Sequence, residues 1–311
     1  MTAPSKARQP GHAGFEVDSA PLQRVHSPRT WWRGFGTSVK EVWEYRELLG
    51  QLIRKELKVR YKDSALGFLW TLVRPLLQLL VYSVAIGIFL GSSRVIPSFG
   101  IYLFTGLLAW SLFTDILGGC AGSIVGNAGL VKKVYFPREL FPLSIVGAAL
   151  INFALQSVIL IGAFAYTGQW PDLADLALVP LALLVLVVFA TALGLVLAAT
   201  NVFLRDVQYL LEVGLLLWFW MTPIVYDWTK VRDQLAGGST HWLYEIYMAN
   251  PMTNVVLSFQ RALWEAGEST PFYYGGSLAG RLGVLLAVCL VLLWVGQRVF
   301  DRASGNFAQE L

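Results

Sequence analysis

Charge is the scarcest property of this chain. Asp, Glu, Lys and Arg make up 14% of its 311 residues, whereas soluble domains carry about 25% of charged residues. Apolar residues reach 56%. Such a chain has more apolar surface than one soluble core can bury, so the composition excludes an ordinary soluble domain. It predicts a membrane protein that crosses the bilayer several times.

Cysteine and histidine are also rare, and their positions exclude two kinds of site. Cys120 and Cys289 fall in or beside apolar segments, where we expect small apolar side chains and not a disulfide. His12, His26 and His241 are scattered, so no metal cluster is expected. The chain has no Walker A motif (GxxxxGK followed by Ser or Thr) to hold the phosphates of ATP. We therefore expect no metal or cofactor in this chain.

The first 30 residues lack an apolar run of signal-peptide length, so no cleaved export signal is expected there. Because this region is rich in Pro, Ser, Gly and charge, residues 1–38 are predicted to form a disordered cytoplasmic tail. An amphipathic interface helix over 39–63 and a transmembrane domain over 64–311 follow it.

The long apolar segments predict an all-α membrane fold with six transmembrane helices. A helix rises about 1.5 Å per residue and needs about 20 residues to cross the hydrocarbon core. Polar residues interrupt the second and fifth segments. The predicted spans cover residues 66–90, 98–119, 143–167, 176–200, 209–226 and 277–299.

Positive charge alternates between the connections, as expected when Lys and Arg remain on the cytoplasmic side. Bases precede the first span, recur between 132 and 138 and at Arg205, and follow the last span. The turn GQWPDLAD contains Asp172 and Asp175 but no base. Both termini are therefore predicted to be cytoplasmic.

Residues 39–63 have apolar side chains at three- and four-residue steps and bases on the opposite face. This pattern predicts an amphipathic helix on the inner leaflet. Two interpretations remain open: membrane anchoring alone, or additional docking of a cytosolic subunit by the polar face. The bases of interest are Arg54, Lys55, Lys58 and Arg60.

The outer segment from 227 to 276 is too long for a simple turn. It contains two short apolar stretches separated by Asn250-Pro251, and each is too short to span the membrane. We expect a re-entrant hairpin between the fifth and sixth spans, which is tolerated at membrane depth only against protein or a wet cavity. It is a candidate outer gate.

A basic and aromatic segment, LVKKVYFPRELFPL, lies between the second and third spans at 130–143. Its charges must face water at a membrane surface. It is either a loop that only sets the topology or a docking site, and its aromatic residues and proline favour docking. The candidate docking residues are Lys132, Lys133, Tyr135, Phe136, Pro137, Arg138 and Glu139.

Five stretches resemble the six-span permease subunits of ABC-2 type polysaccharide exporters. They are RKELKVRYKDSALGFLWTLVRPLL, VKKVYFPRELFPLS, NVFLRDVQYLLE, WFWMTPIVY and NPMTNVVLSFQRALW. The resemblance implies two permease copies in a bacterial inner membrane and two cytosolic ATPase subunits that bind ATP and Mg²⁺. It also implies a lipid-linked polysaccharide that crosses between the copies, with coupling through the 130–143 segment. Membrane lipids are the other expected partner, and nucleic acid is not expected.

Other polar and aromatic residues have two interpretations each. Arg205 and Asp206 form either an ordinary helix-end ion pair or, as the resemblance implies, a minor ATPase contact or hinge. Arg74 either snorkels to the headgroups or faces the transport path. The aromatic residues either form an interfacial belt or stack on sugars. The candidate path residues are Arg74, Gln78, Tyr82, Trp218, Trp220, Tyr244 and Tyr247.

Three alternatives compete with this interpretation. An ABC-2 permease for drugs or small lipids would share the topology. A membrane-embedded glycosyltransferase or phosphotransferase would need paired carboxylates or a metal, and the nearest pair is Asp172 and Asp175. A secondary transporter is disfavoured because no inverted repeat is evident. We expect a transport subunit and not an enzyme.

Overall fold

A computed structural model describes residues 35–61, 69–133, 136–237, 240–264 and 277–311. In these residues every regular element is a helix. The helices are α1 (Phe35–Glu44), α2 (Arg46–Tyr61), α3 (Trp70–Tyr82), η2 (Ser83–Phe89), η3 (Ser92–Arg94), α4 (Phe99–Gly126), α5 (Ala128–Lys133), α6 (Leu140–Thr167), α7 (Leu173–Leu176), α8 (Leu178–Phe203), α9 (Val207–Trp220), α10 (Trp228–Leu235), α11 (His241–Ala249), α12 (Pro251–Leu263), α13 (Leu278–Ser304) and α14 (Phe307–Glu310).

Five helical stretches in the described residues are long and apolar enough to cross a membrane. They agree with the first, second, third, fourth and sixth predicted spans, although the second continues to Gly126, and residues 66–68 of the first lie outside the described ranges. The five stretches are Trp70–Phe89, Phe99–Gly126, Leu140–Thr167, Leu173–Phe203 and Leu278–Ser304.

The fifth predicted span, 209–226, is wrong in its extent. The helix α9 has 14 residues, which corresponds to about 21 Å at the usual rise and is shorter than the hydrocarbon core. It ends at Trp220, and residues 221–226 form turns and bends. Pro223 explains this end, because a proline disfavours helical geometry in the residue before it. That residue, Thr222, donates its hydroxyl to the Trp218 carbonyl at 2.9 Å.

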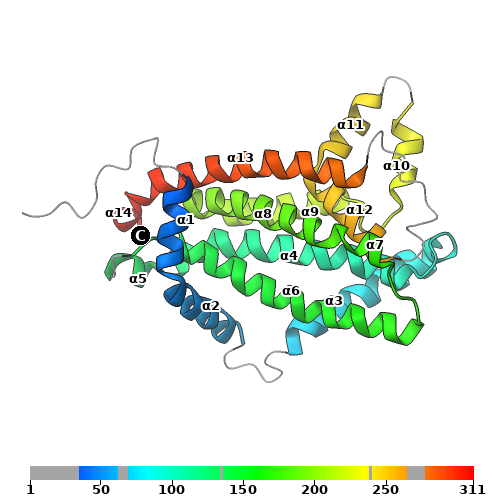
Figure 1. The fold of residues 1–311 in the computed structure, drawn as a ribbon, viewed down its shortest axis with the longest axis horizontal. Coiled ribbons are helices and arrows are strands. Elements are labelled where there is room, and N and C mark those ends of the chain that lie inside the picture. The colour runs from blue at the N-terminus through cyan, green and yellow to red at the C-terminus, as the bar shows by residue number, and fades with distance from the viewer. Residues whose placement is uncertain (1–34, 62–68, 134–135, 238–239, 265–276) are drawn as a thin grey trace, which may run out of the picture. The chain divides into compact units, whose positions relative to one another are not determined.

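The long helices α4, α6, α8 and α13 run side by side (Figure 1). The centre of this bundle is α4, which packs against both α6 and α8 and has the most deeply buried apolar stretch of the five. The neighbour of α8 on its other side is α13, and the two backbones approach closely at Gly296. A Cβ atom there would lie 2.6 Å from the Ala192 carbonyl oxygen. Small residues at such crossings are typical of packed membrane helices.

The two ends of the bundle differ (Figure 1). The helices α5 and α14 and the C-terminus lie at one end, which we call the α14 end. The short helices α7, α10, α11 and α12 lie at the other, which we call the α12 end. At the latter, α12 packs against α4 and α8, and every residue from Met252 to Gln260 is buried. The boundary between α11 and α12 falls at Asn250, whose side chain accepts the Met252 N–H at 3.0 Å, and Pro251 follows as the first helical residue.

The predicted single helix over 39–63 is two helices, with α1 beginning at Phe35 and a break at Tyr45. The break is only a local bend, because the Tyr45 N–H still donates to the Glu41 carbonyl at 3.2 Å and the Tyr45 carbonyl accepts from Leu49 at 2.9 Å. The second helix, α2, packs on α6. Most of the predicted tail lies outside the described residues.

Candidate functional site

The predicted basic and aromatic segment includes α5 and the loop between α5 and α6, at the α14 end (Figure 1). Lys132 and Lys133 end α5 with exposed side chains. Tyr135 lies outside the described residues. Phe136 and Pro137 are half-buried, so the segment combines an exposed cationic part with an anchored part.

The described part of the α5–α6 loop, residues 136–139, turns tightly into α6. The Pro137 carbonyl accepts the Leu140 N–H at 3.2 Å, and the Arg138 carbonyl accepts the Phe141 N–H at 3.3 Å. These bonds continue directly into the first turn of α6. The described part of the loop is therefore joined to the first turn of α6 by backbone hydrogen bonds.

Buried apolar side chains support this loop, and we call them the α14 cluster. Phe136 packs against the cluster, with its ring centroid 5.3 Å from that of Phe141. The guanidinium carbon of Arg138 lies 5.8 Å from the ring centroid of Phe307. Glu139 is buried as well. The cluster consists of Leu52, Ile124, Val131, Leu140, Phe141, Leu195, Ala198, Ala199, Val202, Phe300 and Phe307. Because packed interiors transmit strain, it connects the loop mechanically to α2, α4, α8 and α13.

The four bases of interest on α2 have two different environments. Arg54 and Lys58 are exposed. Lys55 donates a hydrogen bond to the Asn127 side chain after α4, and the Arg60 guanidinium lies 3.2 Å from the Asp115 carboxylate on α4.

The amphipathic helix is therefore fastened to α4 by polar contacts as well as to α6 by apolar ones. Sequence reasoning did not pair these residues. The available signal was an acidic residue, Asp115, inside an otherwise apolar span.

Arg205 and Asp206 lie in the turn between α8 and α9, and both are exposed. Within the described ranges no ion pair joins them. Asp206 occupies the N-cap position of α9 without a side-chain cap bond. Both charges thus face outward at the turn.

Two of the predicted path residues, Arg74 and Gln78, are exposed one turn apart on α3. Tyr82 is half-buried, and its ring stacks on Phe219 of α9 at 5.7 Å between centroids. This stack joins α3 to α9 near their C-terminal ends.

Trp218, also predicted to line the path, is packed into the bundle. Its indole lies edge-on to Phe113 and Phe189, at 5.2 and 6.0 Å between centroids, and its Nε1–H donates to Asn250 Oδ1 at 3.0 Å. Trp220 is 53% exposed. Trp218 therefore attaches the end of α9 to the start of α12, and of this pair only Trp220 faces outward.

At the α12 end, side chains donate hydrogen bonds to backbone carbonyls in the irregular turns. Three carbonyls outside the helices accept from buried or half-buried donors. Unpaired carbonyls at membrane depth are costly, so this bonding permits non-helical backbone inside the protein. Sequence reasoning missed these donors, although polar side chains beside proline-containing turns were the available signal. The bonds run from Gln260 Nε2 to Pro223 (3.0 Å), from the Tyr102 hydroxyl to Tyr226 (2.7 Å) and from Trp264 Nε1 to Pro97 (2.8 Å).

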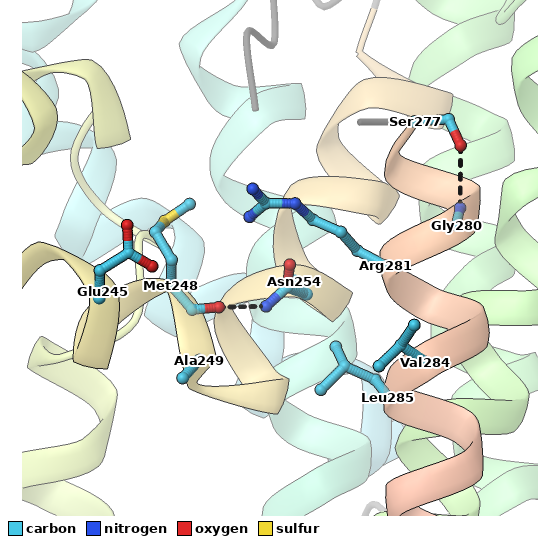
Figure 2. Close-up of a pocket in the computed structure, with 9 residues that line it drawn as sticks. All are labelled: Glu245, Met248, Ala249, Asn254, Ser277, Gly280, Arg281, Val284 and Leu285. Carbon is cyan, nitrogen blue, oxygen red and sulfur yellow. Dashed lines mark hydrogen bonds between the residues drawn. The ribbon is translucent and has the colours of Figure 1, made fainter. Parts of the chain in front are cut away.

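A pocket of about 630 Å³ opens between α11, α12 and the start of α13 (Figure 2). Arg281 points from α13 across the pocket toward α11, where Glu245 lines the opposite wall, and Val284 contributes an apolar part. The volume lies in the range of small-ligand pockets, about 300–1,000 Å³. The Arg281 guanidinium and the Glu245 carboxylate can bond hydroxyl-rich groups.

Two further predicted path residues, Tyr244 and Tyr247, belong to α11. Both pack against a small apolar cluster of Trp228, Met248 and Leu257. Burial raises the pKa of Tyr244, and neighbouring guanidinium groups oppose the shift. The Tyr244 phenol is therefore protonated at neutral pH and can donate a hydrogen bond.

The carboxylates that a transferase would need are engaged in structural contacts. Asp172 accepts the Ala174 N–H at 3.3 Å and caps α7. Asp175 lies 3.1 Å from the Arg261 guanidinium of α12. Among the residues that the structure describes, no three His, Cys, Asp or Glu side chains gather to hold a metal ion. Asp172 therefore caps α7 and Asp175 joins α7 to α12, so both carboxylates have structural contacts and do not form an acid–base pair.

Residues 47–264 match the family model described as ABC-2 type transporter. The chain is 35% identical over 276 residues to the O-antigen export system permease protein RfbA of Myxococcus xanthus, which covers 88% of this chain and 98% of that protein. It is 31% identical over 267 residues to the protein of the same name from Klebsiella pneumoniae, with 85% and 95% covered. The polysialic acid transport protein KpsM of Escherichia coli is 22% identical over 253 residues, with 80% and 90% covered.

Proposed function

Since this chain belongs to the ABC-2 type transporter family, we propose that it is the membrane permease of an ATP-driven exporter of a surface polysaccharide. Its similarity to O-antigen and polysialic acid transport proteins along most of its length supports that substrate class. The sequence has no Walker A motif. ATP and Mg²⁺ therefore bind to a separate ATPase subunit, and that subunit hydrolyses the ATP.

The observation that carries the coupling part of the proposal is the α5–α6 loop seated on the α14 cluster. Exposed Lys132 and Lys133 and half-exposed Arg138 offer charge to a cytosolic partner, while Phe136 attaches the loop to the bundle. A force applied to this loop reaches α6 directly and α8 and α13 through packed side chains. The α14 end is accordingly the cytoplasmic end, on the side predicted for both termini, and the ATPase docks there.

The glycan path is placed between two copies of the chain. The apolar stretch of α3 and η2 is the least buried of the five spans, and it exposes Arg74 and Gln78. On the neighbouring helix α9, Glu212 is exposed as well. Charged side chains in the hydrocarbon core cost about 2.5–3.5 kcal/mol each. A second copy that faces α3 and α9 encloses these groups in a polar path for a lipid-linked glycan.

The pair α11 and α12 forms the outer, re-entrant closure of this path. Its support is the burial of α12 against α4 and α8 and the side-chain hydrogen bonds from Gln260 and Trp264 to the adjoining turns. The pocket beside Arg281 lies at this outer end (Figure 2).

The experiment compares charge reversals at the two ends of the bundle. Arg138→Glu is expected to insert at the normal level, to lose co-purification with the ABC ATPase, and to leave lipid-linked glycan accumulated in the cytoplasm. Lys230→Glu is the matched control, since Lys230 is an exposed base on α10 at the other end. Normal export by Arg138→Glu, or ATP hydrolysis by the purified chain alone, would contradict the proposal.

Depletion of the chain from these cells also distinguishes the proposed exporter from a permease for drugs or small lipids. A permease for drugs or small lipids predicts normal surface polysaccharide when the chain is depleted. The proposed exporter predicts loss of the polymer from the surface, together with its accumulation inside the cell.

A further inference from the structure

The C-terminal helix α14 folds back onto the cluster that supports the α5–α6 loop. Phe300 on α13 and Phe307 on α14 have ring centroids 5.5 Å apart. In a continuous helix, seven residues advance by about 10.5 Å along the axis. The helix instead ends at Ser304, and Gly305 and Asn306 separate it from α14.

Burial on α14 is confined to a single residue. Phe307 is fully buried, whereas Ala308, Gln309 and Glu310 are exposed. A helix of four residues is not stable by itself, so its contacts with the bundle must hold it in place. The Phe307 ring contacts Phe300 and lies 6.2 Å from that of Phe203 at the end of α8.

The same ring lies beneath the guanidinium of Arg138, at 5.8 Å from its centroid. An aromatic face attracts a cation, and Arg is the cation found most often in this position. Leu311 also packs against the α14 cluster, as does Phe136 of the loop. The end of the chain and the α5–α6 loop therefore share one support.

We propose that α14 is a positioning element of the coupling apparatus, in which the Phe307 ring orients Arg138 for the ATPase. This inference rests on the proposed docking of the ATPase at the α5–α6 loop. Phe307 itself is buried and makes no contact with the partner. It acts by limiting the directions in which the Arg138 side chain points, and it links that residue to the ends of α8 and α13.

A double-mutant cycle tests this role. The full-length permease, reconstituted in lipid nanodiscs, is titrated with its co-purifying ABC ATPase, and the dissociation constant is measured. Phe307→Leu keeps an apolar side chain but removes the ring face, and we expect binding weaker by about 3- to 10-fold, as for a lost cation–π contact. In an Arg138→Gln background the same substitution is expected to cause no further loss, because residues that act through one another are not additive.

Phe300→Leu is the matched control, because Phe300 is equally buried in the α14 cluster and contacts the Phe307 ring. Any effect of Phe300→Leu on binding is expected to be the same in both Arg138 backgrounds. If the effect of Phe307→Leu is also the same in both backgrounds, Phe307 only fills the core and the inference is overturned. If Arg138→Gln alone binds the ATPase with normal affinity, the ATPase does not dock at the loop. That result contradicts the proposed coupling, independently of the role of Phe307.

Discussion

Gly296 offers the sharpest test of how the bundle is packed. A Cβ atom at this position of α13 would lie 2.6 Å from the Ala192 carbonyl oxygen and 3.4 Å from its carbonyl carbon on α8. Ordinary contacts of a Cβ atom begin at 3.4 Å. Gly296→Ala therefore requires a local separation of about 0.8 Å (3.4 minus 2.6). The obstacle is backbone, which cannot rotate away as a side chain can.

The expected cost is that of overpacking a core, about 1–3 kcal/mol. Alanine also favours helix over glycine by about 1 kcal/mol, which acts in the opposite direction. Gly283→Ala separates the two effects, since Gly283 lies on the same helix and nothing approaches its Cβ position within 4 Å. The difference between the two variants then reports the contact with α8 alone.

The measurement is the apparent thermal midpoint of the purified full-length chain, with every variant heated at the same rate because membrane proteins commonly unfold irreversibly. Gly296→Ala is expected to unfold several degrees below the parent protein, and Gly283→Ala at or above it. Equal midpoints for the two variants would show that α13 and α8 do not approach as closely as described.

Three further predictions concern polar contacts and orientation. Asn250→Ala should lower the thermal midpoint by the equivalent of about 1–3 kcal/mol, because it removes the Oδ1 atom that both caps α12 and accepts from the half-buried Trp218 indole, whereas Asn250→Asp keeps this acceptor and should approach the parent value. Arg60→Asp and Asp115→Arg should each destabilise the chain, and the double exchange should recover most of the loss; the pair is partly exposed at 40% and 27%, so its coupling should be only about 0.2–1 kcal/mol. Lys133→Cys should react with an impermeant maleimide only after the cells are opened, and labelling in intact cells would invert the proposed orientation; both native cysteines are buried and should contribute little background.

The long spans could be predicted because crossing the hydrocarbon core requires about 20 apolar residues, and composition alone reveals such segments. The fifth failed for an equally local reason. Its apolar character continues past Trp220, but Thr222-Pro223 ends the helix. A hydropathy profile does not detect this helix end, whereas the position of the proline indicates it.

The position of the candidate docking segment at a membrane surface could be predicted from the sequence. The side chains that pack against it could not. The charges at 132–138 require a watery surface wherever the rest of the chain lies. That Phe307 lies under Arg138 depends on how the end of α13 folds back, which no pattern near either residue indicates. The Arg60–Asp115 pair is similar, because an acid in an apolar span requires a partner but does not specify which one.

The two ends of the bundle are stabilised by different interactions. At the α14 end, apolar side chains make non-directional contacts that tolerate small shifts and repacking. At the α12 end, the buried side chains of Gln260 and Tyr102 make directional bonds to backbone carbonyls, and such bonds are costly to break where water does not readily replace them. Under the proposed coupling, the packed α14 cluster therefore passes a displacement of the α5–α6 loop to the long helices. We expect it to reach the α12 end as tilting of these helices and not as local melting of α12, so that the outer turns act as a fixed frame against which the helices move.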